Sequence, residues 1–140
     1  MCTIIKKSQR SHPKTAKEDF IVYKNGYYYK PEFSSVFVGF KYISGQVYKT
    51  NFTYANEYLA AYDYIEGTYR EELFEKGVSP VAVQDGFHSL KTCDTFRLKV
   101  NYSENKYRAE FIIPKGAKYY ENPMGNIVSD TIVFNKIILE

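Results

Sequence analysis

The chain has 140 residues, of which 44% are hydrophobic and 25% are charged, and its formal net charge is +3. This length suits one domain, and the composition is too apolar for general disorder. So small a net charge does not by itself support nucleic-acid binding.

The amino terminus and the cysteines limit the expected location and metal chemistry. Only two consecutive isoleucines, Ile4 and Ile5, precede basic residues, far short of a secretory signal or a membrane span. We therefore expect an intracellular protein with no membrane partner. Cys2 and Cys93 cannot by themselves build a zinc site, and a reducing compartment disfavours a disulfide between them. No metal and no cofactor are expected.

Tyrosine is over-represented, with fifteen copies beside ten phenylalanines and no tryptophan. Tyrosine is enriched at recognition surfaces. An AT-rich genome would also raise the content of Tyr, Lys, Asn, Ile and Phe together. Both explanations stay open, and the genomic one needs no function.

The first 18 residues form a polar leader. The segment from Lys6 to Lys14 has no apolar period, and Pro13 resists regular structure. We expect residues 1–18 to be a flexible polar arm or an edge covering, followed by a single domain over residues 19–140.

Strand patterns dominate the next 30 residues. Residues 20–24 and 27–30 are β-branched and aromatic, and Asn25-Gly26 between them predicts a hairpin turn. A second strand pair is expected over residues 36–43 and 46–50, separated by a turn at Ser44-Gly45.

The middle of the chain changes to a helical period. Apolar residues recur at three- and four-residue intervals between Ala55 and Lys76, which predicts a helix with Gly67 as a candidate break. A tyrosine stripe displayed for a partner is the alternative to core packing there. Residues 81–83 predict a short strand before a turn at Gly86. Residues 90–100 fit a second helical face.

Strands return in the last third. They are expected at 107–113, 119–120, 132–134 and 137–139. Pro114 ends the first of them, because proline has no amide proton for a central ladder. The whole order predicts an α+β domain with a mostly antiparallel sheet and one or two helices.

Candidate ligand-binding residues begin at the Gly86 turn. His88 can act as acid, base or hydrogen-bond donor near neutral pH, and the plain alternative is a histidine bonded to backbone. Phe87 and Ser89 flank it. Ser89 has no acidic neighbour in sequence, so it is expected to cap a helix from Leu90 rather than act as a nucleophile.

Charged residues complete the candidate site. Lys115 and Lys118 surround a tight turn that could hold a phosphate or carboxylate, or could simply be solvated. Glu121 and Asp130 are the acidic candidates for catalysis. Both lie beside turn residues, and neither belongs to a spaced acidic pair.

The order of these features resembles a group of short uncharacterised proteins encoded by bacteriophages, mobile elements and gut bacteria. The resemblance runs from about residue 16 to the end. It rests on four segments: Val22-Tyr23-Lys24, Gly86-Phe87-His88-Ser89, Ile113-Pro114-Lys115-Gly116 with the following Ala117-Lys118-Tyr119-Tyr120, and Ser129-Asp130. It implies an origin, in the cytoplasm of a bacterial host, and no agreed activity.

More remotely, the same order is similar to the ADP-ribosyltransferase fold. The resemblance implies that Lys24 replaces the arginine that binds the dinucleotide and that Asp130 replaces the catalytic glutamate. Phe87-His88-Ser89-Leu90 replaces most of the serine-threonine motif. Lysine lacks the planar fork of arginine, and aspartate reaches less far. A degenerate fold that has lost its activity is what these departures imply.

Three functions follow. The favoured one is a non-catalytic binding protein in which a cleft near Lys24, Tyr48 and His88 holds a nucleotide-like ligand or a host protein segment. In that cleft Phe87, Ser89 and Lys115 would also contact the ligand, and Lys24 and His88 would face a common hollow. The second is a diverged ADP-ribosyltransferase-like enzyme acting on NAD through Asp130 or Glu121. The third is a protein–protein interaction module without a small-molecule site.

Overall fold

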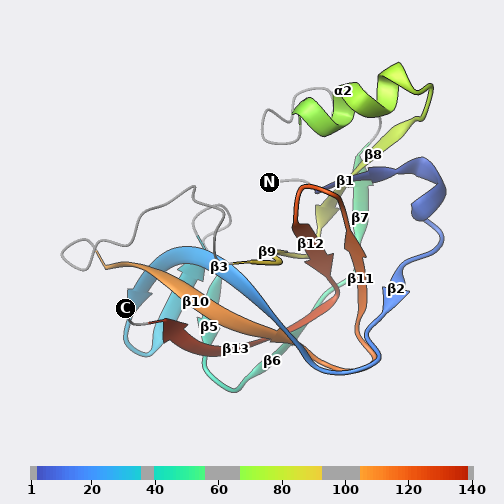
Figure 1. The fold of residues 1–140 in the computed structure, drawn as a ribbon. Coiled ribbons are helices and arrows are strands. Elements are labelled where there is room, and N and C mark those ends of the chain that lie inside the picture. The colour runs from blue at the N-terminus through green and yellow to red at the C-terminus, as the bar shows by residue number, and fades with distance from the viewer. Residues whose placement is uncertain (1–2, 36–39, 56–66, 93–104, 139–140) are drawn as a thin grey trace.

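Antiparallel β-sheet is the main structure of this protein. The computed structural model describes residues 3–35, 40–55, 67–92 and 105–138. In these ranges Figure 1 shows strands, one α-helix and one short 3-10 helix. The predicted α+β class, with a degenerate ADP-ribosyltransferase-like fold as a candidate, is therefore wrong. Segments with β-branched and aromatic alternation extend into more strands than the sequence pattern indicated, and the helix is a minor element.

Ten strands form the larger sheet. Its order is β2-β11-β12-β9-β3-β10-β13-β6, with β4 added to β3 and β5 added to β4. The bounds are β2 Lys14–Thr15, β3 Phe20–Tyr29, β4 Glu32–Ser35, β5 Lys41–Ile43, β6 Val47–Lys49, β9 Phe87–Leu90, β10 Lys106–Ile113, β11 Lys118–Glu121, β12 Asn126–Ser129 and β13 Thr131–Ile138. Neighbouring strands run antiparallel.

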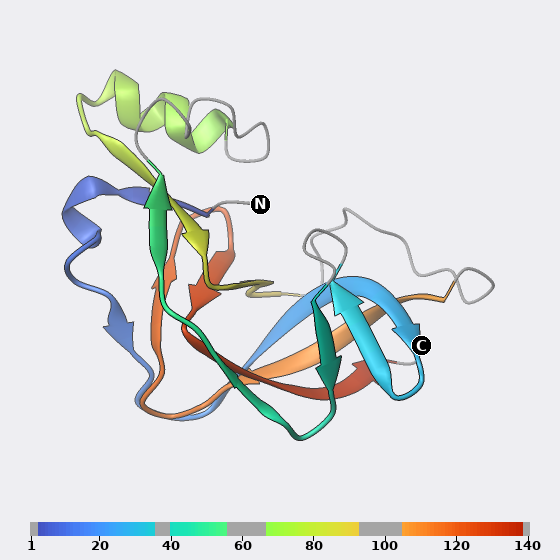
Figure 2. The same cartoon turned by 180° about the vertical axis from the view of Figure 1, so that it is seen from behind.

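The middle of this sheet curls around a hydrophobic core. Two series of paired strands extend from the two edges of β3, and we call them the wings. One consists of β4 and β5, and the other consists of β10, β13 and β6. Figure 2 shows the wings curving toward each other. Their far ends are linked, because Gly45 N–H donates to the Phe134 carbonyl at 2.9 Å and Ile43 N–H donates to the Tyr48 hydroxyl at 2.8 Å. The core between the wings includes Val22, Phe33, Tyr42, Ala109, Phe111, Ile132 and Phe134.

The predicted hairpin at Asn25-Gly26 is wrong. β3 runs straight through these residues, and the turn to β4 comes later, at Lys30-Pro31. Gly26 serves a different purpose from a turn glycine. A Cβ there would lie 2.1 Å from the carbonyl oxygen of Ser34, so only glycine lets β4 approach this closely.

Residues near the amino terminus belong to the fold, in contrast to the flexible arm that we expected. β1 (Thr3–Lys6) pairs with β8 (Pro80–Asp85), which also pairs with β7 (Thr53–Ala55) to make the three-stranded sheet. Thr3, Ile4 and Ile5 are completely buried. The 3-10 helix η1 (Lys7–Gln9) follows, and β2 pairs with β11. Edge covering, the other expectation, fits β1 and β2, because each is an edge strand of its sheet.

The helix α2 (Gly67–Glu75) covers the small sheet. Tyr69 and Leu73 pack against Ile4 and Ala82. The predicted helix over residues 55–76 is thus present in its second half. Ala55 instead ends β7, and residues 56–66 lie outside the described ranges. The expected helix from Leu90 is wrong at its start, since Leu90 ends β9. Residues 93–100, including Cys93, are not described, and neither is Cys2.

Several strand predictions are confirmed. β8 includes Val81–Val83, β10 ends at Ile113 directly before Pro114, and β11 contains Tyr119 and Tyr120. The two closing strands are one strand, β13, with a register shift opposite Glu110 and Phe111. In the described ranges no helix is long and apolar enough to cross a membrane.

Candidate functional site

Lys24 lies inside the curled sheet. Its side chain leaves β3 on the same face as Val22 and Gly26, and the residue is 6% exposed. The ammonium donates to the backbone carbonyl of His88 and lies 5.6 Å from the ring centroids of Tyr42 and Phe111. Burial lowers the pKa of Lys24 from 10.5 to about 7, because the charged form loses its hydration.

Three of the predicted ligand-binding residues meet around Tyr42. Besides Lys24, the ring of Tyr48 lies 5.2 Å from that of Tyr42, and the ring of Phe87 lies 6.2 Å away. We call Lys24, Tyr42, Tyr48, Phe87 and Phe111 the lysine cluster. Its contacts are those of a packed interior, with perpendicular ring pairs that contribute to stability.

Ser89 faces the same interior. The register that pairs Tyr23 with Leu90 places Ser89 across from Lys24. Ser89 is 5% exposed, and its hydroxyl has no hydrogen-bond partner among the described residues. It lies within a strand, so the predicted helix cap is wrong.

The ring of His88 points away from the lysine cluster. Its Nε2 donates to the Gln84 carbonyl at 2.9 Å, and its Nδ1 then accepts from the Thr3 hydroxyl at 2.9 Å. Burial is the main cause that lowers the pKa of His88 to about 4. Successive side chains of a strand alternate between faces, so His88 stands opposite Phe87 and Ser89. The common hollow that we expected for the Lys24 and His88 side chains is therefore wrong.

The remaining predicted residues are spread over other elements. Lys115 is exposed in the turn after β10, and its amide donates to the Asp19 carboxylate. Asp130 accepts from the Lys118 amide at 3.0 Å and from the Thr131 hydroxyl at 2.9 Å. These bonds hold turns together and leave no catalytic grouping around Asp130 in the described ranges.

Glu121 lies at a pocket of about 560 Å³. Lys91 and Lys14 reach its carboxylate at 3.1 and 3.8 Å. The pocket is lined by Lys6, Ser8, Gln9, Tyr69, Lys91, Glu121, Asn122, Pro123 and Gly125. Its size suits a small ligand, but its floor residue Asn122 is already bonded to the backbone of Ile4, Met124 and Asn126. Across the described ranges no three His, Cys, Asp or Glu side chains gather as metal ligands.

Sequence reasoning missed a surface of tyrosines and cations on the outside of the curled sheet. Odd-numbered residues of β3 point away from the core, among them Tyr23, Tyr27 and Tyr29. Lys106 pairs with Tyr27, and Arg108 pairs with the intervening Asn25. We call Tyr23, Tyr27, Tyr29, Lys106 and Arg108 the tyrosine face. Tyr29 is 62% exposed, and the other four are half-buried.

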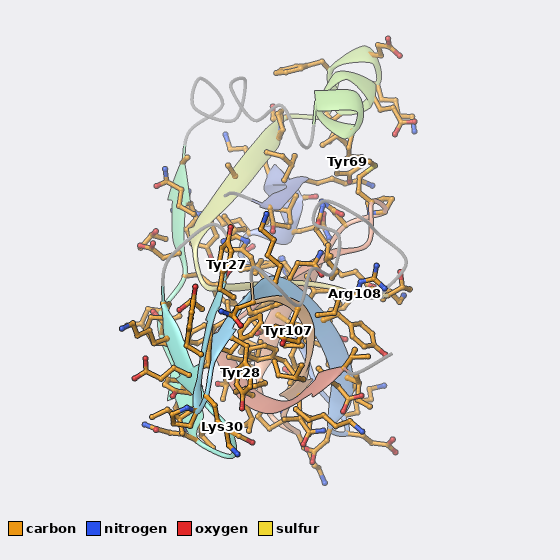
Figure 3. The ribbon with its side chains drawn as sticks, turned by 90° about the vertical axis from the view of Figure 1, so that its left-hand side faces the viewer. Tyr27, Tyr28, Lys30, Tyr69, Tyr107 and Arg108 are labelled. Atoms are coloured by element: carbon orange, nitrogen blue, oxygen red, sulfur yellow. The ribbon has the colours of Figure 1, made fainter. Side chains whose placement is uncertain are left out.

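The neighbourhood of the tyrosine face adds aromatic rings and charge. Figure 3 shows Tyr27, Tyr28, Tyr107 and Arg108 at the same part of the molecule, well away from Tyr69. Tyr28 and Tyr107 make a perpendicular ring contact at 6.0 Å and close the core beneath. Five charged residues lie near the tyrosine face: Lys30 directly after β3, Glu32 on β4, Lys41 on β5, Glu110 on β10 and Lys136 on β13. Glu32 is bound by Lys41 at 3.5 Å.

The tyrosine face had a signal in the sequence. Tyrosine recurs at positions 23, 27 and 29, which share one face only if the strand is continuous. A hairpin turn at Asn25-Gly26 would have separated Tyr23 from the other two.

Comparison with known proteins identifies no relative of this chain. No protein-family model, no curated protein and no solved structure matches the chain significantly.

Proposed function

We propose that this protein is a non-catalytic binding protein that holds a nucleotide-like ligand on its tyrosine face. The observation that carries the proposal is the register that sets Tyr27 beside Lys106 on the outside of the sheet, with Arg108 one pair further along. The ligand class is the one expected from the sequence. Its place is new, since Lys24 and Tyr48 belong to the packed lysine cluster. As the sequence resemblance implies, we place the binding in a bacterial cytoplasm.

The chemistry of the tyrosine face suits such a ligand. A tyrosine ring offers a flat surface on which a base can stack, and stacking is tolerant of base identity. Cations at one strand's distance, about 4.8 Å, can neutralise the phosphate that the sugar of that nucleotide carries. Arg108 adds a planar group that can hold two phosphate oxygens at once.

Binding without turnover fits the acidic residues. Glu121 is paired with lysines, and Asp130 accepts a hydrogen bond from the backbone amide of Lys118, the first residue of β11. Neither carboxylate belongs to β3 or β10, the strands of the tyrosine face. The NAD-cleaving alternative predicts release of nicotinamide, and loss of that release in Asp130→Ala.

The test is a thermal-shift and calorimetric screen of the full chain with AMP, UMP, NAD and inorganic phosphate. We expect the nucleotides to raise the Tm, because selective binding to the native state stabilises it, and phosphate alone to raise it less. Tyr27→Ala should weaken nucleotide binding by about 1–3 kcal/mol, the usual contribution of one stacked base. Tyr27→Phe should keep most of it.

A matched control is Phe74→Ala. Phe74 is an exposed aromatic residue on α2, remote from β3. Nucleotide affinity should be unchanged in this variant. The proposal fails if no nucleotide binds, or if Phe74→Ala weakens binding as much as Tyr27→Ala. Nicotinamide release from NAD would contradict the non-catalytic part.

A further inference from the structure

The tyrosine face extends along the length of β3. Tyr23 and Tyr29 are separated by six residues of one strand, which spans about 20 Å. One mononucleotide would cover only part of that length. A ligand that uses the whole face must therefore be longer than one nucleotide.

The spacing of the rings suits a chain of bases. Tyr27 and Tyr29 are two residues apart, so their side chains leave the strand about 6.8 Å from each other. That is twice the ~3.4 Å rise per nucleotide of a stacked strand. Bases that are opened from their regular stack can then lie on successive rings.

The cations run beside the rings. Lys106 stands opposite Tyr27, Arg108 stands opposite Asn25, and both are on the strand next to β3. A sugar-phosphate backbone laid along β10 would put phosphates at these cations while the bases rest on β3. Lys136 stands opposite Glu110 on the following strand, and Glu110 stands opposite Tyr23, so the positive charge is concentrated at Lys106 and Arg108.

From this arrangement we infer that the tyrosine face binds single-stranded nucleic acid with little sequence preference. The inference rests on the proposed function and extends its ligand from a nucleotide to an oligonucleotide. A duplex hides its base faces, so it offers nothing for the rings to stack on. The overall net charge of +3 is small, but Lys106 and Arg108 of β10 belong to the face itself.

The experiment is fluorescence anisotropy of the full chain with labelled oligodeoxythymidine of about 3, 8 and 20 nucleotides, lengths that bracket common site sizes of about 4–16 nucleotides. A duplex of the longest length and the mononucleotide are measured alongside. We expect affinity to rise with length and then level off, and the duplex to bind more weakly than the matching single strand. Each neutralised phosphate should contribute about −0.7 to the slope of log K against log salt.

Variants locate the binding. Tyr29→Ala is safe for folding because the side chain is 62% exposed, and it should weaken binding of the longest strand by about 5- to 150-fold. Lys106→Ala should reduce the salt slope by about 0.7. Phe74→Ala and Lys17→Ala, an exposed cation outside the face, should change neither quantity.

The outcomes separate the two levels of the argument. If mononucleotide and longest strand bind equally well, the inference is overturned and the proposed function stands. Equal binding of duplex and single strand also overturns it. If neither nucleotides nor oligonucleotides bind, both proposals fall.

Discussion

Lys24 is the residue with the most unusual environment in the described part of the chain. It carries an amine into a core of aromatic rings, where the His88 carbonyl accepts its hydrogen bond. Removing a charge from water without a paired carboxylate is unfavourable, so the folded protein favours the neutral amine. Folding and protonation of Lys24 are therefore coupled.

The coupling predicts that stability rises with pH above neutrality. The unfolded lysine keeps its proton up to a pKa near 10.5, and the folded one loses it near a pKa of about 7. Between these values the unfolded state binds more protons, so the free energy of unfolding increases by up to about 1.4 kcal/mol per pH unit. Urea unfolding of wild type and Lys24→Met at pH values of about 6, 7.5 and 9 measures this.

Lys24→Met is the matched comparison because methionine fills a similar volume without a charge. The variant should exceed wild type in stability at the lowest pH, and the difference should shrink toward the highest. A pH-independent difference between the two proteins would refute the coupling. The comparison also cancels the titration of groups that both proteins share.

Among the elements, β3 decides how the molecule is built and what it displays. Its even-numbered residues enter the core, and its odd-numbered residues make the tyrosine face. Both sets depend on the strand continuing through Asn25 and Gly26. Gly26 makes this possible by letting the β4 backbone approach.

Gly26→Ala tests the close approach. The added Cβ would meet the Ser34 carbonyl oxygen at 2.1 Å, and backbone cannot move aside as a flexible side chain can. We expect the free energy of unfolding to fall by about 1–3 kcal/mol, the usual range for overpacking. Chemical denaturation measures it. Asn25→Ala, whose position already carries a Cβ, should lose less, and equal losses would show that the contact with β4 is unimportant.

Three strands, β3, β8 and β10, show what sequence patterns could and could not predict. Val81–Val83 and the end of β10 before Pro114 follow from local chemistry alone, and both are confirmed. Asn25-Gly26 has the local chemistry of a turn, but a distant strand, β4, decides its conformation. The lysine cluster was predicted only in part, since Tyr42 meets Lys24 and Phe87 through pairings that no local pattern specifies.

At the scale of the whole molecule, the two sheets bury different hydrophobic clusters. The small sheet with α2 buries Ile4, Tyr69 and Leu73, and the pocket at Glu121 is lined by residues from both sheets. The curled sheet (Figure 1) encloses the lysine cluster and presents the tyrosine face outward, and Figure 3 labels Tyr27 and Arg108 of that face. The lining of the pocket and the tyrosine face have no residue in common, so a ligand can be assigned to one of them.

That assignment is tested most directly by an NMR titration of isotope-labelled protein with AMP and then with a short oligonucleotide. The account predicts that amide signals of β3 and β10, above all those of Tyr27, Tyr29 and Lys106, shift with ligand concentration. Signals of Lys6, Lys91 and other residues at the Glu121 pocket should stay in place. Shifts confined to that pocket, or none on β3 and β10 at saturating ligand, would contradict the tyrosine face as the binding site.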